Sequence, residues 1–315
     1  MGRGVTLCYE TFGEPSNPAA LLIMGLGTQM IGWQEDFCGE LAARGLYVVR
    51  FDNRDIGHST HMRGRPPTTL QLLRRSSRAA RYTLGDMAED AVGLMTELDI
   101  APAHVIGASM GGMIAQTIAA RHPSRVRSLV SIMSNTGGIR SGQPSLRAYR
   151  VLLSRAPRER EAFVTHMQMV FATIGSASMP RDQADLRMIA GVSYDRDHDP
   201  SGPGRQLAAI IAAGNRTPEL RRIVAPTLVI HGTADPLIAP SGGRATARAI
   251  PGSELLMIEG MGHDLPRMAW PRLIDAIAGH ALRADAANLR ADAAKPRADA
   301  ANAPVPTGPS PVAGR

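Results

Sequence analysis

The chain has 315 residues, which is enough for one large domain with a cap and a tail, and its hydrophobic fraction of 44% is ordinary for a globular protein. The net charge is +7, and every basic residue except Lys295 and the histidines is an arginine. We expect no nucleic-acid partner, because the sequence shows no basic patch interleaved with aromatic residues and no helix-turn-helix pattern. No apolar run approaches the ~18 residues of a transmembrane helix. Stable membrane insertion is therefore not expected, whereas a peripheral membrane contact remains possible.

The cysteine content and the first residues predict the compartment. Cys8 and Cys38 are the two cysteines, too few for a disulfide framework in a domain of this size, and we expect both to be reduced. The N-terminal residues lead almost directly into strand-like sequence and show no signal-peptide pattern. These features favour a cytoplasmic protein.

Strand-like and helix-like segments alternate through the first part of the chain, which predicts a mostly parallel sheet with helices on both faces. Between a strand at 47–51 and a helix that Thr83 caps lies a basic insertion, residues 61–81, with six arginines and no acidic residue. This insertion could face anionic lipid or be a solvated loop. The strands expected here are Val5–Phe12, Ala19–Met24, Tyr47–Phe51, Ala103–Ile106 and Val126–Met133.

The alternation stops after residue 136 and resumes near residue 223. The stretch between reads as several helices with Pro and Gly breaks, which is typical of a helical cap inserted into a sheet protein. We therefore divide the chain into a first core part (1–136), a cap (137–222), a second core part (223–283) and a tail (284–315). The tail repeats one heptad three times and is rich in Pro, Gly and Ser near its end, so we expect it to be mostly disordered.

The motif Gly107-Ala108-Ser109-Met110-Gly111 is G-x-S-x-G, the pattern of a nucleophile elbow. A strand-like run precedes it and a helix-like run follows it, so Ser109 would lie on a sharp strand-to-helix turn. The two glycines would let neighbouring backbone pass where a Cβ would clash. Outside such a context the same motif is an ordinary Gly/Ser turn.

A serine nucleophile needs a base, and the base needs an orienting acid. The candidate acid is Asp235, directly after the strand-like run 227–230, and the candidate base is His263, directly after the run 254–258. Both positions lie at carboxyl ends of strands, where α/β sheets place their sites. Asp264 is adjacent to the base, and we expect its side chain to point elsewhere.

The remaining site residues are less sharply defined. The N–H groups of Met110 and Leu26 are the candidate oxyanion donors, Met110 because it follows the nucleophile and Leu26 because its loop follows the strand 19–24. The candidate pocket residues, which could equally be plain packing residues, are Met30, Trp33, Met110, Phe163, Met167 and Phe171. We expect no metal, since no H-E-x-x-H or clustered Cys/His spacing is present.

Over residues 5–282 the chain resembles the α/β-hydrolase superfamily. The matching motifs are 22–27, 52–59, the elbow at 107–112 and Gly260–His263, in family order. More narrowly, the chain resembles actinobacterial carboxylesterase/lipase-like serine hydrolases and, more distantly, aclacinomycin methylesterases. The resemblance implies the α/β-hydrolase fold with an eight-stranded sheet, a Ser-His-Asp triad, no cofactor and a cap. It also implies that Asp52, Arg54, Gly57 and Ser59 hold the loop beside the oxyanion turn.

Three functions fit these residues. The first is hydrolysis of small-molecule carboxylic esters with apolar acyl or ring groups, with lipids as one option, through an acyl-enzyme on Ser109. The second is a haloperoxidase-like or C–C-bond-cleaving reaction with the same triad and no cofactor. The third is a ligand-binding receptor with little turnover. The sequence does not fix the oligomeric state.

Overall fold

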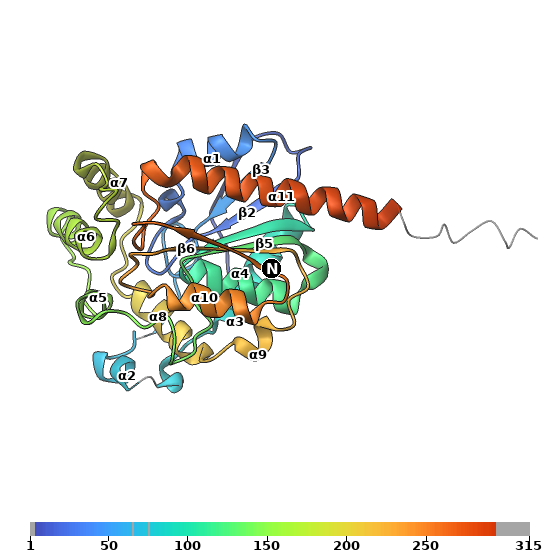
Figure 1. Ribbon diagram of the computed structural model, residues 1–315. Coiled ribbons are helices and arrows are strands. Elements are labelled where there is room, and N and C mark those ends of the chain that lie inside the picture. Colours follow the sequence, from blue (N-terminus) through green and yellow to red (C-terminus); the bar gives the residue numbers. More distant parts are fainter. Residues whose placement is uncertain (1–3, 65, 75, 294–315) are drawn as a thin grey trace, which may run out of the picture.

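The computed structural model describes residues 4–64, 66–74 and 76–293, and these residues form a seven-stranded sheet between layers of helices (Figure 1). The strand order is β1-β3-β2-β4-β5-β6-β7, with β1 antiparallel to β3 and the other pairs parallel. The strands are β1 (Tyr9–Phe12), β2 (Ala19–Ile23), β3 (Tyr47–Phe51), β4 (Ala103–Ala108), β5 (Val126–Ile132), β6 (Thr227–Gly232) and β7 (Glu254–Ile258).

The sheet therefore has the expected α/β-hydrolase architecture with one strand fewer than the eight that the resemblance implied. The difference lies at the N-terminal edge, where Val5–Phe12 was expected as a strand and Tyr9–Phe12 pairs with β3. Val5 and Leu7 are nevertheless buried in the core.

The order of the strands fixes where a site can form. The chain passes from β2 outward to β3 and then returns to the other side of β2 to form β4, so the loops after β2 and β4 diverge at a topological switch point. Ile23 pairs with Gly107 at this point, where open α/β sheets bind their ligands. These two loops carry Leu26 and Ser109.

Two helical layers bury the sheet. Helices α1 and α11 cover one face, and α3, α4 and α10 cover the other (Figure 1). A capping box between Thr83 and Asp86 starts α3, as the sequence predicted. These helices are α1 (Glu35–Ala42), α3 (Leu84–Glu97), α4 (Met110–Arg121), α10 (Ser241–Ala249) and α11 (Trp270–Ala293), with a short α2 (Thr69–Leu73) in the basic insertion and 3-10 turns at Met30–Gly32, Ser77–Ala79, Pro123–Arg125 and Arg267–Ala269.

The cap lies between β5 and β6, inside the predicted interval 137–222. In Figure 1, α5, α6 and α7 lie together on one side of the sheet, with α8 between them and the core. The cap helices are α5 (Leu146–Leu152), α6 (Arg160–Ile174), α7 (Gln183–Arg196), α8 (Gly202–Ala213) and α9 (Thr217–Leu220). None of the described helices is both long enough and apolar enough to span a bilayer.

The last described helix corrects the predicted tail. The tail was expected to be disordered from residue 284, but α11 continues to Ala293. Ala284 is buried, and Asp285 pairs with Arg127 at 3.0 Å and contacts the buried His104 ring at 3.3 Å. Contacts with the core thus accompany the extension of α11 beyond residue 284. The sequence of this segment is too polar to predict a packed helix by itself. The prediction for 294–315 concerns residues outside those described.

We predict that Asp285→Ala lowers the free energy of unfolding by about 1–3 kcal/mol, because Nε2 of His104 loses its partner inside the core. The matched control is Asp275→Ala on the same helix, which removes an exposed salt bridge to Arg44 and is expected to cost about 1 kcal/mol or less. Urea unfolding measures both values. Equal effects would show that α11 is not anchored through Asp285.

Candidate active site

Ser109 occupies a strained turn between β4 and α4. Its backbone has φ 56° and ψ −117°, in the positive-φ range that residues other than glycine rarely adopt. Its N–H donates to the carbonyl of Ile132 at 2.9 Å, which ties the turn to β5. The strain is compensated by this surrounding structure, as is typical of functional turns.

The glycines of the motif are there for close packing. A Cβ on Gly107 would lie 2.1 Å from the carbonyl oxygen of Gly111, and a Cβ on Gly111 would lie 2.0 Å from the carbonyl oxygen of Ile23. Both contacts are with backbone, which cannot move aside without moving a strand. The start of α4 is thereby pressed against the end of β2.

The structure brings the three predicted catalytic residues together. Nε2 of His263 lies 2.9 Å from Oγ of Ser109, and Nδ1 of His263 lies 2.8 Å from Oδ2 of Asp235. The side chain of Asp235 is fully buried, and that of His263 is 7% exposed. This is the geometry in which an imidazole can take the hydroxyl proton while a carboxylate fixes its orientation.

The turn after β6 holds the carboxylate of Asp235. Its Oδ1 accepts the N–H groups of Leu237 and Ile238, both at 2.9 Å. Nε2 of His231 lies 2.8 Å from the carbonyl oxygen of Ile238, in the same turn. Burial lowers the pKa of His231, so this second histidine is neutral near neutral pH and supports the turn. Sequence reasoning assigned His231 no role, although its place four residues before Asp235 was a usable signal.

The two candidate oxyanion donors lie on either side of Ser109. Met110 is the first residue of α4, so its N–H has no acceptor within the helix. A Cβ on Gly25 would lie 3.7 Å from Oγ of Ser109, so the loop that carries Leu26 passes directly beside the nucleophile. The placement of both residues agrees with an oxyanion hole.

A cap residue that the sequence did not predict fixes the oxyanion loop. Gln206 of α8 accepts the N–H of Gly27 at 2.8 Å and donates to the carbonyl of Arg54 at 2.9 Å. On the other side of the loop, Asp52 accepts the N–H of Met30 at 2.7 Å, and Asn53 donates to the carbonyl of Met24 at 3.0 Å. The loop thus depends on both the 52–59 segment and the cap.

A cavity of about 590 Å³ extends from Ser109 and His263 into the cap. Phe163, Met167 and Phe171 of α6 line it, as predicted. Most of the other lining side chains are also apolar, including Leu153, Leu186, Ile189, Leu207, Ile211 and Leu237.

The other predicted pocket residues do not line this cavity, so that prediction is wrong for their side chains. Met30, Trp33 and Met110 are all fully buried. Trp33 packs on Phe37 beneath α1, with ring centroids 5.5 Å apart, and Met110 packs in the core between the sheet and α4. Ile31 and Gly32, which lie between Met30 and Trp33 in the sequence, line the cavity instead.

The cap is hydrogen-bonded directly to the loop that carries His263. The N–H of His263 donates to the carbonyl of Ile174 at 2.7 Å, and the N–H of Gly262 donates to Oγ of Ser176 at 2.8 Å. The Asp264 carboxylate accepts the N–H of Ser176 at 3.0 Å, so it points away from the triad as expected. Nε of Arg181 lies 3.3 Å from the same carboxylate.

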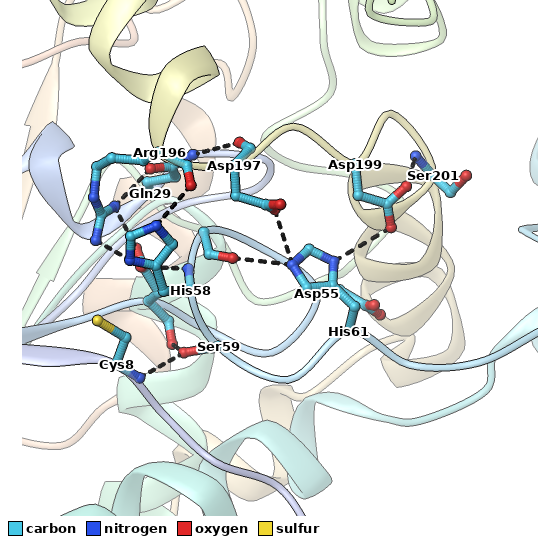
Figure 2. Close-up of polar contacts among 12 residues, drawn as sticks. Cys8, Gln29, Asp55, His58, Ser59, His61, Arg196, Asp197, Asp199 and Ser201 are labelled. Atoms are coloured by element: carbon cyan, nitrogen blue, oxygen red, sulfur yellow. Dashed lines mark hydrogen bonds and ion pairs between the residues drawn. The ribbon is translucent and has the colours of Figure 1, made fainter.

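A second junction joins the end of α7 to the oxyanion loop (Figure 2). Arg196 donates to Oε1 of Gln29 at 2.6 Å and to Oδ2 of Asp52 at 3.1 Å. The ring of His61, from the core, lies 3.0 Å from Asp197 and 3.4 Å from Asp199. Burial of the ring disfavours its protonation, but the Gly57 carbonyl and the two carboxylates outweigh this and raise the pKa of His61.

Asp55, His61 and Asp199 approach one another closely enough to suggest a metal site. Arg205, however, donates to both oxygens of Asp55 at 2.9 and 2.7 Å and to Asp199 at 2.7 Å. A guanidinium therefore already supplies the positive charge that these carboxylates need. The donor set fits a salt-bridge network better than a cation site.

The geometry and the comparisons with known proteins agree. The family model for the α/β-hydrolase fold matches residues 18–266. The chain belongs to this family. It is 28% identical to rhodomycin D methylesterase DauP from Streptomyces sp. (strain C5), over 89% of this chain and 96% of that protein. It is 25% identical to 3-oxoadipate enol-lactonase 2 from Acinetobacter baylyi, over 82% of this chain and 86% of that protein.

A solved α/β-hydrolase structure extends this similarity to three dimensions. The enol-lactonase from Burkholderia xenovorans LB400 matches with a TM-score of 0.68 and 27% identity, covering 90% of this chain and 97% of that one. The structural match therefore extends over most of both chains.

We predict that Gly111→Ala destabilises the hydrolase by more than about 3 kcal/mol, because the new Cβ would clash with backbone at the end of β2. The control is Gly39→Ala in α1, where a Cβ meets no atom within 4 Å, and it should stabilise by about 0.5–1 kcal/mol. Thermal unfolding compares the two variants. A stable Gly111→Ala protein would disprove the close approach.

We predict that His61 stabilises the folded protein more at acidic pH, through its contacts with Asp197 and Asp199 of the cap. Because its pKa is raised in the folded state, its contribution is complete below the unfolded pKa of about 6.5 and disappears as the pH rises through the folded value. The loss of unfolding free energy in His61→Gln should therefore be larger at pH 5.5 than at pH 8.5. A pH-independent loss would show that the ring acts only by packing.

Proposed function

We propose that this protein is a serine hydrolase that cleaves carboxylic esters of apolar acyl or ring substrates. The observation that carries the proposal is the Ser109–His263–Asp235 hydrogen-bond chain at the end of a largely apolar cavity. The esterase and lactonase relatives support the same reaction class.

The geometry assigns each residue a step. Oγ of Ser109 attacks the ester carbonyl carbon while Nε2 of His263 takes its proton, and Asp235 stabilises the imidazolium. The N–H groups of Met110 and Leu26 bind the oxyanion, each contributing about 3–4 kcal/mol to transition-state stabilisation. The C–O bond then breaks as His263 protonates the leaving alcohol. A water molecule, activated by His263, finally hydrolyses the acyl-enzyme and releases the acid.

The cavity favours a particular range of esters. A volume of about 590 Å³ lies within the 300–1,000 Å³ typical of sites for small organic molecules. Together with the methylesterase relatives, this supports methyl esters of apolar or ring-containing acids as the first substrate class to test. Lipid esters are the second class. The free thiols of Cys8 and Cys38 support a cytoplasmic location.

Other relatives keep the second candidate reaction open. A protein named putative non-heme bromoperoxidase BpoC, from Mycobacterium tuberculosis, is 27% identical over 82% of this chain, and a 2-hydroxymuconate semialdehyde hydrolase from Pseudomonas putida is 30% identical over 58% of it. A triad with an apolar cavity can serve either chemistry, so these reactions belong in the same substrate screen. A receptor function would require tight ligand binding without turnover.

We predict that the protein hydrolyses p-nitrophenyl esters and that Ser109→Ala or His263→Ala lowers kcat/KM by about 10⁴-fold or more. Asp235→Asn should lose about 10⁴-fold, because the imidazole loses its orienting acceptor. His122→Ala, at a surface histidine paired with Glu89, is the control and should retain activity. Full activity in folded Ser109→Ala protein would refute the proposal.

A further inference from the structure

The positive charge of the chain is concentrated in two segments. Residues 61–81 contain six arginines and residues 137–158 contain five, and neither segment has an aspartate or glutamate. Without these eleven charges the rest of the chain would have a net charge of −4 instead of +7. The basic character of the protein is therefore a local property, which a uniformly arginine-rich composition does not explain.

The two segments, which we call the arginine segments, meet at one cavity. The first contributes Pro66, Pro67 and Leu72 to its lining, and the second contributes Pro144, Tyr149 and other residues up to Arg158. Helices α2 and α5 belong to these segments and lie on the cap side of the molecule, at the lower left of Figure 1. Two of the arginines, Arg155 and Arg158, line this cavity themselves, and the others belong to the same two lining segments.

The arginines of these segments that the structure describes have no carboxylate partner among the described residues. All nine that the structure describes are exposed, and none forms a salt bridge within the described part of the chain. Some exposed arginines elsewhere, among them Arg160, Arg187 and Arg267, do pair with carboxylates. The nine are Arg63, Arg74, Arg78, Arg81, Arg140, Arg147, Arg150, Arg155 and Arg158.

Exposed apolar side chains accompany the charge. Leu70 in α2 is 55% exposed, Ile139 is 74% exposed, and Leu146 at the start of α5 is 82% exposed. A surface for a small soluble anion would need the charges but not these side chains. Arginines beside exposed leucine and isoleucine are the combination that binds an anionic lipid interface, where the charges face headgroups and the apolar groups enter the acyl boundary.

We propose that the two arginine segments dock the cavity entrance onto an anionic lipid surface. Docking would place the apolar cavity next to the phase in which apolar esters dissolve, so it names a partner for the site proposed above. Only the biological role of docking, the supply of ester substrates, rests on the proposed function. The binding itself requires no turnover and can be measured separately.

The test is co-sedimentation of the full-length protein with vesicles. We expect strong binding to phosphatidylcholine vesicles that contain phosphatidylglycerol and about tenfold or more weaker binding to pure phosphatidylcholine. Binding to the anionic vesicles should fall sharply in about 1 M salt, where the screening length is about 3 Å. Ser109→Ala protein should bind equally well, which separates docking from catalysis. Equal binding to both vesicle types, or no binding to either, would overturn the proposal.

Two variants with the same change in charge localise the surface. Arg74→Gln/Arg78→Gln/Arg147→Gln/Arg150→Gln should reduce binding to anionic vesicles about tenfold or more, without changing hydrolysis of a water-soluble ester. Arg221→Gln/Arg222→Gln/Arg248→Gln/Arg290→Gln removes four exposed arginines that do not line the cavity, and it should bind like the unmodified protein. An equal loss in both would show that net charge, not this surface, determines binding.

The apolar contribution is tested in the same assay. Leu146→Ser is expected to weaken binding to anionic vesicles several-fold while leaving stability unchanged, because the side chain is already mostly exposed. Unchanged vesicle binding in a Leu146→Ser/Ile139→Ser protein would contradict insertion of these side chains.

Discussion

The close approach of α4 to β2 is the constraint on which the rest of the site depends. Gly111 lies so near the Ile23 carbonyl that no Cβ fits between them. This contact sets the start of α4, and the start of α4 sets the positive φ of Ser109. The nucleophile, the free N–H of Met110 and the loop beyond β2 therefore occupy fixed positions before any substrate binds. Such preorganisation is the main means by which a site of this kind stabilises developing charge.

The cap completes the site that the sheet begins. Two elements of the candidate machinery have a hydrogen-bond partner in the cap: Gln206 holds the oxyanion loop, and Ile174 holds the backbone of His263. Arg196 further joins Asp52 and Gln29 on the far side of the same loop. The cap is thus a structural part of the catalytic arrangement as well as the wall of the cavity.

The sequence predicted the features that short-range patterns encode. The elbow, the strand-end positions of Asp235 and His263, and the capping box at Thr83 all follow from local steric or hydrogen-bonding rules, and the structure places them as predicted. The side chains of Met30 and Trp33 were misplaced because they lie in and directly after a single short 3-10 turn. There no periodicity tells which of two neighbouring side chains faces the cavity.

Other features could not be predicted because distant residues determine them. Gln206 reaches the oxyanion loop across more than half of the chain, and Asp285 keeps α11 helical by reaching Arg127 and His104. The sequence around Gln206 and around Asp285 contains no pattern that would predict these contacts. The seven strands, in contrast, were each visible in the sequence, six as apolar runs and the first as an alternating segment, and the eighth came from the resemblance alone.

The bond from His263 to Ile174 has a consequence for how such enzymes diversify. A cap that carries part of the catalytic backbone cannot be exchanged as one unit without disturbing the base. Changes in substrate range are then confined to the parts of the cap that make no such bond, above all the beginning of α6, because even the N-cap of α5 is tied to the Asp235 turn through the Ser145 N–H and the Pro236 carbonyl at 2.8 Å. The segment from Ile174 to Arg181 belongs functionally to the core, although the chain order assigns it to the cap. Grafting experiments among relatives should draw their boundary there.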